Sequence, residues 1–370
     1  MRILMPTNLF YPSNMGGPAK TLYWLAKELV ANGVQASIVT TSNYIAEGHV
    51  VEDEWQDVEG MRVHYCKGNY KFSVKVVRQA CKELRECDAV IFSSLCYLPN
   101  FFIALQARLS GKKIIWSPRG ELFDSAIKGS KCKRIYFSLL KKLFASKTIF
   151  HATSSIEEDH IKKYFGQDCR TVVLPNYVEM PRKMERNENP EPYFLYMGRI
   201  APIKAIDRLV EACCKSEAFR SSSYKLLLAG IKEGDYYKQL EKTIKEHGLE
   251  DRILFLGEVS SDEKFQIYAD ARYLFLVSHS ENFGNVVVEA LSQGTPVVAS
   301  KGTPWVTLEE NNAGYWIDNT VEEITRMVDE IINQNDTQYA EMRRNAEQLA
   351  QSFDISRNIH RWITLLDDNK

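Results

Sequence analysis

Two carboxylates stand eight residues apart in the stretch SENFGNVVVEAL, at Glu281 and Glu289. The apolar run YLFLVS, residues 273–278, precedes them, and an apolar run with helical character follows the Phe-Gly-Asn turn. A helix that starts at this turn leaves its first backbone N–H groups free to bind an oxygen-rich ligand, and Gly284 lets that ligand approach the backbone. We expect Glu289 about two turns into this helix, near its buried side. The alternative is one surface glutamate before a helix and one on its exposed face.

Two cations follow an earlier apolar run in the same half of the chain. The segment MGRIAPIKAIDRLVEA places Arg199 directly after the run YFLYMG, residues 193–198, and Lys204 at the start of a helix. Arginine offers a planar fork to phosphate oxygens and lysine offers a point charge, so the pair could neutralise a diphosphate without a metal ion. The alternative is a solvated basic turn.

A third polar group, Arg119, follows the apolar run IIWS in the first half of the chain. Arg119 could contact a phosphate, bind an anionic acceptor, or pair with Glu121 or Asp124. His151 also ends an apolar run, and a structural histidine with satisfied hydrogen bonds is at least as good an interpretation there. His279 is notable only because it stands close to Glu281.

The elements that must position these groups alternate between apolar strands and amphipathic helices. Near-continuous apolar strands that alternate with helices predict an α/β protein with parallel sheets covered on both faces. Strands are predicted near residues 2–7, 35–41, 61–66, 89–94, 113–118, 148–154, 171–176, 193–198, 225–230, 252–257, 273–278, 296–300 and 314–318. The clearest helices are predicted near residues 18–32, 132–144, 205–216, 236–247, 262–269, 285–293, 321–333 and 354–366.

A chain of 370 residues suits two such domains. The polar, proline-rich segment Pro181–Tyr193 looks like a linker, which predicts an N-terminal Rossmann-like domain over residues 1–185. A second Rossmann-like domain is predicted over residues 186–350, and the helix in residues 351–370 is predicted to pack back toward the first domain. Ligands of such sheets bind at the carboxyl ends of the strands, here in a cleft between the domains.

Composition excludes several classes of protein. The net charge of −1 gives no reason to expect nucleic-acid binding, and no run of eighteen apolar residues is present to span a membrane. The N-terminal residues MRILMPTNLF are interpreted as a first buried strand rather than a signal peptide. The eight cysteines form no CxxC pair, which favours reduced thiols in a cytoplasmic protein, and no zinc-binding pattern is visible.

Taken together, these motifs resemble those of the retaining glycosyltransferases of family 4, the bacterial group 1 type with the GT-B fold. The resemblance spans nearly the whole chain and is most specific over Tyr193–Pro304. The motifs that carry it are the two glutamates in an E-x7-E arrangement, the GRI…K segment with Gly198, SQGTPVVASKGTP at Ser292–Pro304, VVLPNYV at Val172–Val178, and the glycine loop within Asn8–Leu29. The chain departs from the pattern at Arg119, near which many relatives carry a histidine.

The resemblance implies that the N-terminal domain binds the acceptor and the C-terminal domain binds the nucleotide-sugar donor. It also implies a role for each motif. Arg199 and Lys204 would hold the donor diphosphate and act in catalysis. Glu289 would bind the ribose hydroxyls, and Glu281 would contact the transferred sugar and share in catalysis. The donor site would further include Gly16, Gly17, Arg119, Phe283, Gly284, Asn285 and Val286. No metal and no cofactor are expected, and the donor is expected to be a UDP-sugar before a GDP-sugar.

The acceptor is less well defined by the sequence. Residues 108–147 contain eleven lysines or arginines and two acids, Glu121 and Asp124. The basic, amphipathic residues 131–147 could contact the inner face of a membrane, or could form a core-packed helix with a solvated basic face. We therefore expect transfer of a hexose or N-acetylhexosamine to a glycan or lipid-linked acceptor in bacterial surface polysaccharide synthesis. A sugar-nucleotide 2-epimerase and a non-catalytic nucleotide-sugar binding protein are the alternatives.

Overall fold

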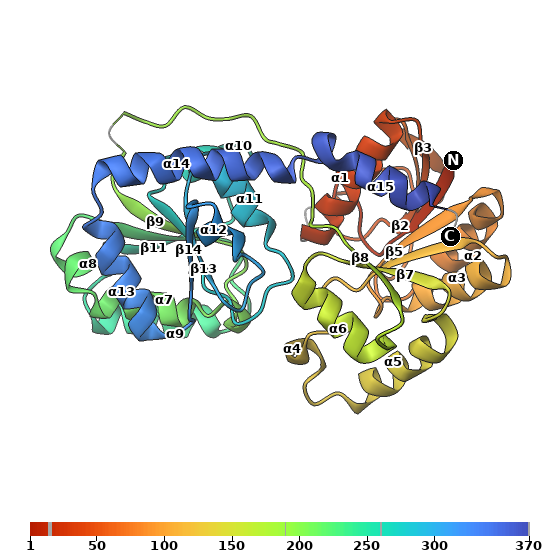
Figure 1. Cartoon of the computed structure of the whole chain (residues 1–370), viewed down its shortest axis with the longest axis horizontal. Helices are drawn as coiled ribbons and strands as arrows, with labels where there is room; N and C mark the ends of the chain where they lie inside the picture. Colours follow the sequence, from red (N-terminus) through yellow and green to blue (C-terminus); the bar gives the residue numbers. More distant parts are fainter. Residues whose placement is uncertain (14–16, 189, 260, 369–370) are drawn as a thin grey trace. The chain divides into compact units, whose positions relative to one another are not determined.

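The chain divides into two compact units, each with its own parallel sheet (Figure 1). The structure is a computed structural model that describes residues 1–13, 17–188, 190–259 and 261–368. Unit 1 comprises Met1–Glu179 and the C-terminal segment from Ile355, and unit 2 comprises Met180–Asp354. The division therefore falls at Glu179, before the predicted boundary at residue 185.

The sheet of unit 1 has eight strands in the order β3-β4-β2-β1-β5-β6-β7-β8. All neighbouring strands pair in parallel except β3 and β4, which form an antiparallel hairpin at the edge. The sequence did not predict β3. The strands are β1 (Arg2–Pro6), β2 (Gln35–Thr41), β3 (Trp55–Val58), β4 (Met61–Cys66), β5 (Ala89–Ser93), β6 (Lys113–Ser117), β7 (Thr148–Ala152) and β8 (Arg170–Val173).

Helices cover both faces of this sheet. Successive residues of a strand point to opposite faces, so in β1 Leu4 packs against one helical layer while Ile3 and Met5 pack against the other. The layer beside Leu4 contains α2 (Val74–Glu83), η1 (Leu84–Glu86), α3 (Leu98–Leu109), α5 (Lys131–Phe144) and α6 (Ser155–Phe165), with the short α4 (Asp124–Ile127) before α5. The opposite layer contains α1 (Gly17–Ala31) and α15 (Ile355–Asp367).

The last helix, α15, is bonded into unit 1 at both ends. The Ile355 N–H donates to the Val178 carbonyl at 3.0 Å. At the other end, the Lys113 ammonium donates to the Leu366 carbonyl at 3.1 Å, where a cation offsets the free carbonyls of a helix C-terminus.

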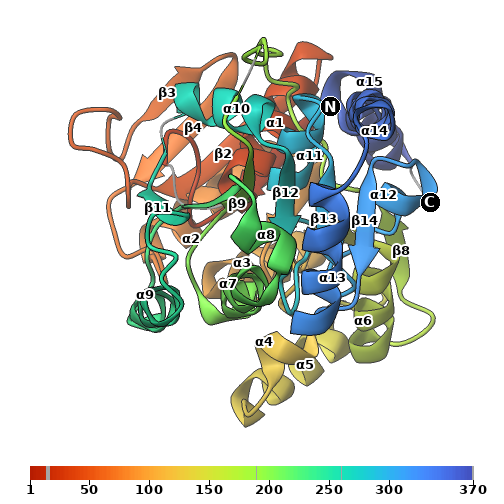
Figure 2. The ribbon, with the colours of Figure 1, turned by 90° about the vertical axis from the view of Figure 1, so that its left-hand side faces the viewer.

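The sheet of unit 2 has six parallel strands in the order β11-β10-β9-β12-β13-β14. Figure 2 shows β11, β9, β12, β13 and β14 of this sheet in that succession. All six were predicted. They are β9 (Tyr193–Met197), β10 (Lys225–Ala229), β11 (Ile253–Gly257), β12 (Tyr273–Leu276), β13 (Val297–Ser300) and β14 (Gly314–Ile317).

Two helical layers also cover the sheet of unit 2 (Figure 1). One contains α7 (Ile206–Lys215), α8 (Glu217–Ser221), α9 (Tyr236–Glu246) and α13 (Val321–Ile332), and the other contains α10 (Ser261–Asp270), α11 (Asn285–Ser292) and α14 (Asp336–Ala350). Short helices η2 (Pro202–Lys204), α12 (Thr307–Glu310) and η3 (Gln351–Phe353) complete the unit. The sequence analysis did not name α14.

The proline-rich segment after Glu179 is not a free linker, because its backbone and side chains bond to unit 2. The Met184 N–H donates to the Gln293 side chain at 2.8 Å, and the Asn187 N–H donates to the Asp270 carboxylate at 2.9 Å. This extended segment is therefore part of unit 2.

Within the described part of the chain, no helix has both the length and the apolar character that crossing a bilayer requires.

His151 is a structural residue in the core of unit 1. The Leu174 carbonyl can only accept, so Nε2 of His151 carries the proton and donates to it at 2.9 Å, while Nδ1 accepts from the Ser117 hydroxyl at 2.7 Å. The ring is also 4.7 Å from the Trp362 ring of α15, between centroids. Burial, with a further contribution from the nearby Arg119 charge, lowers the pKa of His151 from 6.5 to about 3. His151 is therefore neutral in the folded protein.

This lowered pKa predicts acid sensitivity. Between about pH 6.5 and pH 3 the unfolded chain binds a proton at His151 that the folded chain does not, so the stability from this group is present above pH 6.5 and lost as the pH falls. We expect the group to remove about 2 kcal/mol from the free energy of unfolding between pH 7 and pH 5. Denaturant unfolding of the wild type and of His151→Gln at both pH values measures this difference, and an equal loss in the two proteins would contradict the assignment.

Candidate functional site

The predicted donor residues lie at the point where the strand order of unit 2 reverses. The first strand, β9, lies between β10 and β12, so the loops after β9 and β12 leave the carboxyl edge of the sheet side by side and then diverge. Crevices at such switch points are the usual ligand sites of open α/β sheets. Arg199 and Lys204 are on the loop after β9, and Glu281 is on the loop after β12.

Lys204 and Glu281 form an ion pair that joins these two loops. Their side chains are 16% and 17% exposed, so both charges are largely withdrawn from water. The backbone joins the same loops, because the His279 N–H donates to the Ile203 carbonyl at 2.9 Å. The sequence thus predicted two residues of one cluster from separate motifs 77 positions apart.

Close backbone contacts hold the Glu281 loop in place. The Glu281 N–H donates to the Gly302 carbonyl at 3.0 Å, on the loop after β13. A Cβ atom at Gly302 would lie 2.4 Å from the His279 carbonyl oxygen, so this contact requires glycine. The neighbouring Phe283 is buried against the rings of Trp305 and Phe353, at centroid distances of 5.0 and 5.8 Å.

The N-terminus of α11 has the form of an oxygen-binding site. Gly284 is its N-cap, with φ of +86°, a left-handed conformation that glycine adopts without strain. Glycine has no side chain that could cap this end, so the first turn receives no hydrogen bond from the side chain of its N-cap residue. These N–H groups and the helix dipole favour negative or oxygen-rich groups. Asn285 and Val286 begin this helix and Phe283 precedes its N-cap, and their contact with the donor stays a prediction.

Glu289 lies in a second charged cluster, between α10 and α11. It is 7% exposed and accepts from the Lys264 ammonium at 2.7 Å and from the Tyr268 hydroxyl at 3.0 Å. Burial and the Glu289 charge raise the pKa of Tyr268 well above its usual value, so the hydroxyl stays a donor. Because α11 begins at Asn285, Glu289 is about one turn into the helix, which corrects the predicted two turns.

Lys264 and Tyr268 were not predicted from the sequence. They stand four residues apart on α10 and therefore on one face of that helix, which is the only local signal. Their partner Glu289 is on another helix, so the pairing depends on the fold.

Arg199 points to a different partner from Lys204. Its guanidinium pairs with Glu233 at 2.8 Å, on the segment after β10, and the two side chains are 62% and 53% exposed. An exposed pair of this kind contributes little to stability and is readily exchanged for another anion. In this structure Arg199 does not join the cluster of Lys204 and Glu281.

In unit 1 two of the predicted donor residues, Gly17 and Arg119, lie at the carboxyl edge of the sheet. Its strand order reverses between β1 and β5, and Gly17 begins α1 after β1; Gly16 lies outside the described residues. Arg119, after β6, donates to the Asn176 side-chain oxygen at 2.7 Å, while its Nε atom is buried without a hydrogen-bond partner. Burial lowers the pKa of Arg119 from its usual value.

The expected alternative partners of Arg119 are engaged elsewhere. Glu121 accepts from the Ser94 hydroxyl and from two backbone N–H groups of residues 95 and 96, and burial raises its pKa. Asp124 pairs with Lys163 at 2.9 Å. The proposed pairing of Arg119 with either acid is therefore wrong, and its contact with the donor stays a prediction.

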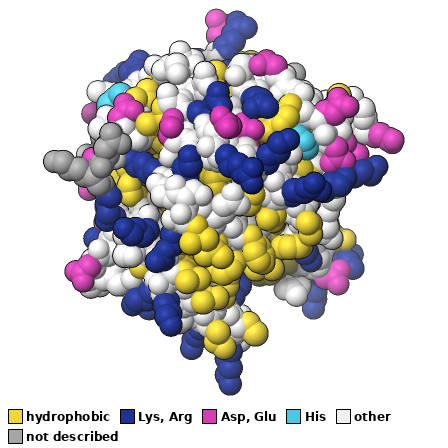
Figure 3. All heavy atoms as spheres, turned by 90° about the vertical axis from the view of Figure 1, so that its right-hand side faces the viewer, with side chains coloured by type: hydrophobic (Ala, Val, Ile, Leu, Met, Phe, Trp, Pro, Cys, Tyr) yellow, Lys and Arg dark blue, Asp and Glu magenta, His cyan; other side chains and the backbone are white. Residues whose placement is uncertain are grey.

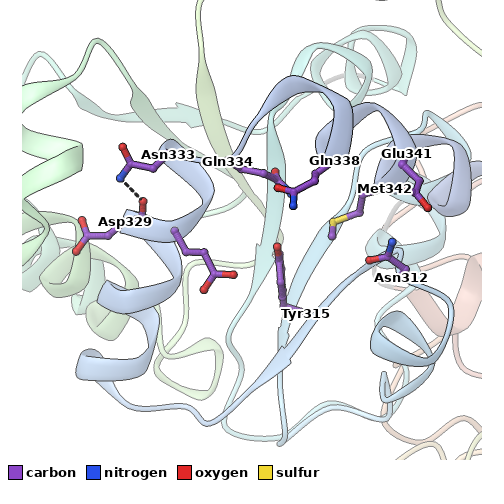
Figure 4. Close-up of a pocket in the computed structure, with 9 residues that line it drawn as sticks. Asn312, Tyr315, Asp329, Asn333, Gln334, Gln338, Glu341 and Met342 are labelled. Atoms are coloured by element: carbon purple, nitrogen blue, oxygen red, sulfur yellow. Dashed lines mark hydrogen bonds between the residues drawn. The ribbon is translucent and has the colours of Figure 1, made fainter.

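An open cavity of about 720 Å³ lies elsewhere on unit 2, among α13, α14 and β14 (Figure 4). Its lining contains three carboxylates, those of Asp329, Glu330 and Glu341, and no lysine or arginine. This charge disfavours a diphosphate, so we do not assign the donor to it. Among the described residues, no group of three or more His, Cys, Asp or Glu side chains is arranged to hold a metal ion.

Comparison with known proteins agrees with this geometry. The family model described as "Glycosyl transferases group 1" matches residues 178–349, and that described as "Glycosyl transferase 4-like domain" matches residues 16–177. A GDP-mannose:cellobiosyl-diphosphopolyprenol alpha-mannosyltransferase of Xanthomonas campestris is 24% identical over 83% of this chain and 80% of the relative.

Solved structures show the same fold. Sucrose-phosphate synthase of Thermosynechococcus elongatus superimposes with a TM-score of 0.78 at 17% identity, over 98% of both chains. HepE of Anabaena, solved in complex with UDP and glucose, superimposes with a TM-score of 0.76 at 18% identity, over 99% of this chain and all of HepE. The two family models together span nearly the whole chain, and the chain belongs to the group 1, family 4 type glycosyltransferases with the GT-B fold.

Proposed function

We propose that this glycosyltransferase moves a hexose or N-acetylhexosamine from a nucleotide-diphosphate sugar to a glycan or lipid-linked acceptor, with retained anomeric configuration and without a required metal. The product belongs to bacterial surface polysaccharide synthesis. The observation that carries the proposal is the ion pair of Lys204 and Glu281 at the switch point of unit 2, beside the N-terminus of α11 at the glycine N-cap.

Each donor group is recognised by a feature of unit 2. Lys204 binds the diphosphate, and Arg199 exchanges its exposed partner Glu233 for a phosphate oxygen. Glu281, released from Lys204, accepts from hydroxyls of the transferred sugar. Glu289 accepts from the ribose hydroxyls, and Lys264 and Tyr268 fix its orientation.

The reaction then needs no nucleophilic side chain. The bond between the anomeric carbon and the diphosphate oxygen breaks, and the nucleoside diphosphate leaves with that electron pair. The acceptor oxygen bonds to the anomeric carbon on the same face, and its proton passes to an oxygen of the leaving phosphate. Lys204 and Arg199 stabilise the charge that grows on the diphosphate, which lowers the barrier.

The nucleobase and the acceptor are the open choices within this proposal. A UDP-sugar is our first candidate and GDP-mannose the second, because the Xanthomonas relative is named for GDP-mannose. The loop around residues 258–260, where we place the base, includes Ser260, which lies outside the described residues. On unit 1, we place the acceptor at the carboxyl edge of the sheet and a peripheral membrane contact at residues 131–147.

Lys204→Ala tests the diphosphate site. We expect kcat/KM to fall by about 100-fold or more, since one donor of this kind contributes about 3 kcal/mol to transition-state stabilisation. The far-ultraviolet circular dichroism should persist. The matched control is Lys215→Ala, which removes an exposed lysine from the far end of α7 and should leave the rate within about twofold. Near-normal turnover in Lys204→Ala would refute the assigned role.

A thermal-shift panel tests the donor. UDP-glucose, UDP-N-acetylglucosamine, GDP-mannose and ADP-glucose are each added to the wild type, Glu289→Gln and a control, Glu323→Gln, at a partly buried residue of α13 that pairs with Arg326. A ligand at about 100 times its Kd adds about 2.7 kcal/mol to the free energy of unfolding, which raises Tm by several degrees.

We expect one nucleotide class to stabilise the wild type and Glu323→Gln, and to lose most of its effect in Glu289→Gln. Equal shifts in all three proteins would place the ribose away from Glu289. The absence of any shift would contradict the proposed donor site.

A further inference from the structure

Helix α3 is apolar on both sides. Its sequence, LPNFFIALQARL, contains Arg108 as its one charged residue. Ile103, Ala104 and Ala107 are buried against the sheet. On the opposite side Leu98, Phe102 and Leu109 are 47%, 46% and 79% exposed. Their spacing of four and seven residues places them in one stripe along the helix. A helix that is hydrophobic all round is usually covered on both sides.

The stripe continues onto the neighbouring segments of unit 1. The Phe72 ring, just before α2, lies 6.2 Å from the Phe102 ring, between centroids. On α5, Ile135 and Leu139 are 71% and 43% exposed and one turn apart. Rings also connect α3 to α5, since Phe101 lies 6.3 Å from Tyr136. We call the exposed side chains the α3 surface; they are Phe72, Leu98, Phe102, Leu109, Ile135 and Leu139.

Cations dominate the charge of the helices that carry this surface. The charged residues of α2, α3 and α5 are Lys75, Arg78, Lys82, Glu83, Arg108, Lys131, Lys133, Arg134, Lys141 and Lys142. The one acid among them, Glu83, is buried and accepts from Ser37 and Arg62, both at 2.8 Å. Figure 3 shows the end of the molecule that carries α2 and α3, where hydrophobic side chains gather in the lower half with lysines and arginines around them.

The combination of apolar area and positive charge distinguishes between possible partners. An exposed apolar patch of this kind marks an interaction surface. A second copy of the chain, joined about a twofold axis, would bring the same cationic helices together, and like charges across an interface cost several kcal/mol. An anionic bilayer accepts both features, because apolar side chains enter the acyl boundary while lysines and arginines meet the headgroups.

We propose that the α3 surface docks unit 1 on an anionic membrane, with α3 and α5 lying in the plane of the headgroups. This surface is wider than residues 131–147, and α3 supplies its apolar centre. The helices follow β5 and β6 in the chain, so their first residues lie at the carboxyl edge of the sheet, beside the switch between β1 and β5. That edge is thereby held at the membrane surface.

The inference about the acceptor rests on the proposed function, which it extends by naming where the acceptor would be carried. An acceptor whose reactive hydroxyl is carried by a lipid in the same membrane would be presented at the edge where we place the acceptor. Membrane binding itself requires neither donor nor turnover, so it can be measured separately.

The test is co-sedimentation of the purified full chain with vesicles of phosphatidylcholine alone and of phosphatidylcholine with phosphatidylglycerol. We expect binding to the anionic vesicles only, weakened by salt. Leu98→Ser/Phe102→Ser should reduce the partition coefficient several-fold, and Arg134→Gln/Lys141→Gln/Lys142→Gln at least tenfold. The charge-matched control is Lys238→Gln/Lys242→Gln/Lys245→Gln on exposed α9 of unit 2, and the apolar control is Leu256→Ser. Both should bind as the wild type does.

The same variants are assayed for the donor thermal shift, which reports an intact unit 2. A retained shift with lost vesicle binding supports the membrane surface whether or not the transfer assignment holds. Three results overturn the inference: a wild type that ignores anionic vesicles, an α9 variant that loses as much binding as the α5 variant, or a solution dimer that Leu98→Ser/Phe102→Ser disperses. If no nucleotide sugar raises the Tm of the wild type, the proposed function is refuted and the membrane inference is not affected.

Discussion

The ion pair of Lys204 and Glu281 is the constraint around which the donor site is built. Both charges are largely removed from water, and either alone would be costly to bury, so each is tolerated because the other is present. The loops after β9 and β12 are thereby fixed at the switch point before any ligand arrives. A ligand that separates the pair must offer an anion to Lys204 and hydroxyl donors to Glu281. A diphosphate joined to a sugar offers both within a few bonds, which explains why these two side chains occur together.

Glu289, one turn inside α11, is likewise a buried carboxylate that is stabilised by a cation. Lys264 and Tyr268 satisfy its buried carboxylate and leave it little rotational freedom. A ribose that bonds to Glu289 therefore meets an oriented acceptor, and less conformational entropy is lost on binding. Under the proposed assignment the two clusters bind the donor differently. The first cluster exchanges its internal ion-pair partner for the ligand, while the second keeps its partners and adds the ligand.

The sequence predicted the strands well because parallel strands that are buried on both faces consist of short runs of apolar residues. It failed where this signal is absent. The edge strand β3, WQDV, is half polar, and α14 has a buried stripe of one tyrosine, one methionine, one leucine and two alanines among many polar residues. The type of site was predictable because motifs after strands converge at one edge of a sheet. The partners were not: Lys264 and Tyr268 are on a different helix from Glu289, and Arg199 pairs with Glu233 across a loop. Those contacts exist only once the chain is folded.

In unit 1 the carboxyl edge of the sheet is held by many hydrogen bonds, whereas the outer side of the helical layer leaves apolar side chains exposed. The loops after β5, β6 and β7 are bonded together by the carboxylates of Glu121 and Glu157, and neutral His151 completes the core. On the outer side of α3, Leu98, Phe102 and Leu109 stay largely exposed. The net charge of the whole chain is −1, so the cationic excess of α2, α3 and α5 is balanced by acids elsewhere. A uniformly basic protein would bind any polyanion, whereas a neutral chain with one cationic, apolar side is drawn to an anionic surface in one orientation. The charge distribution thus orients the protein on the membrane, and the apolar stripe of α3 makes the contact that keeps it bound.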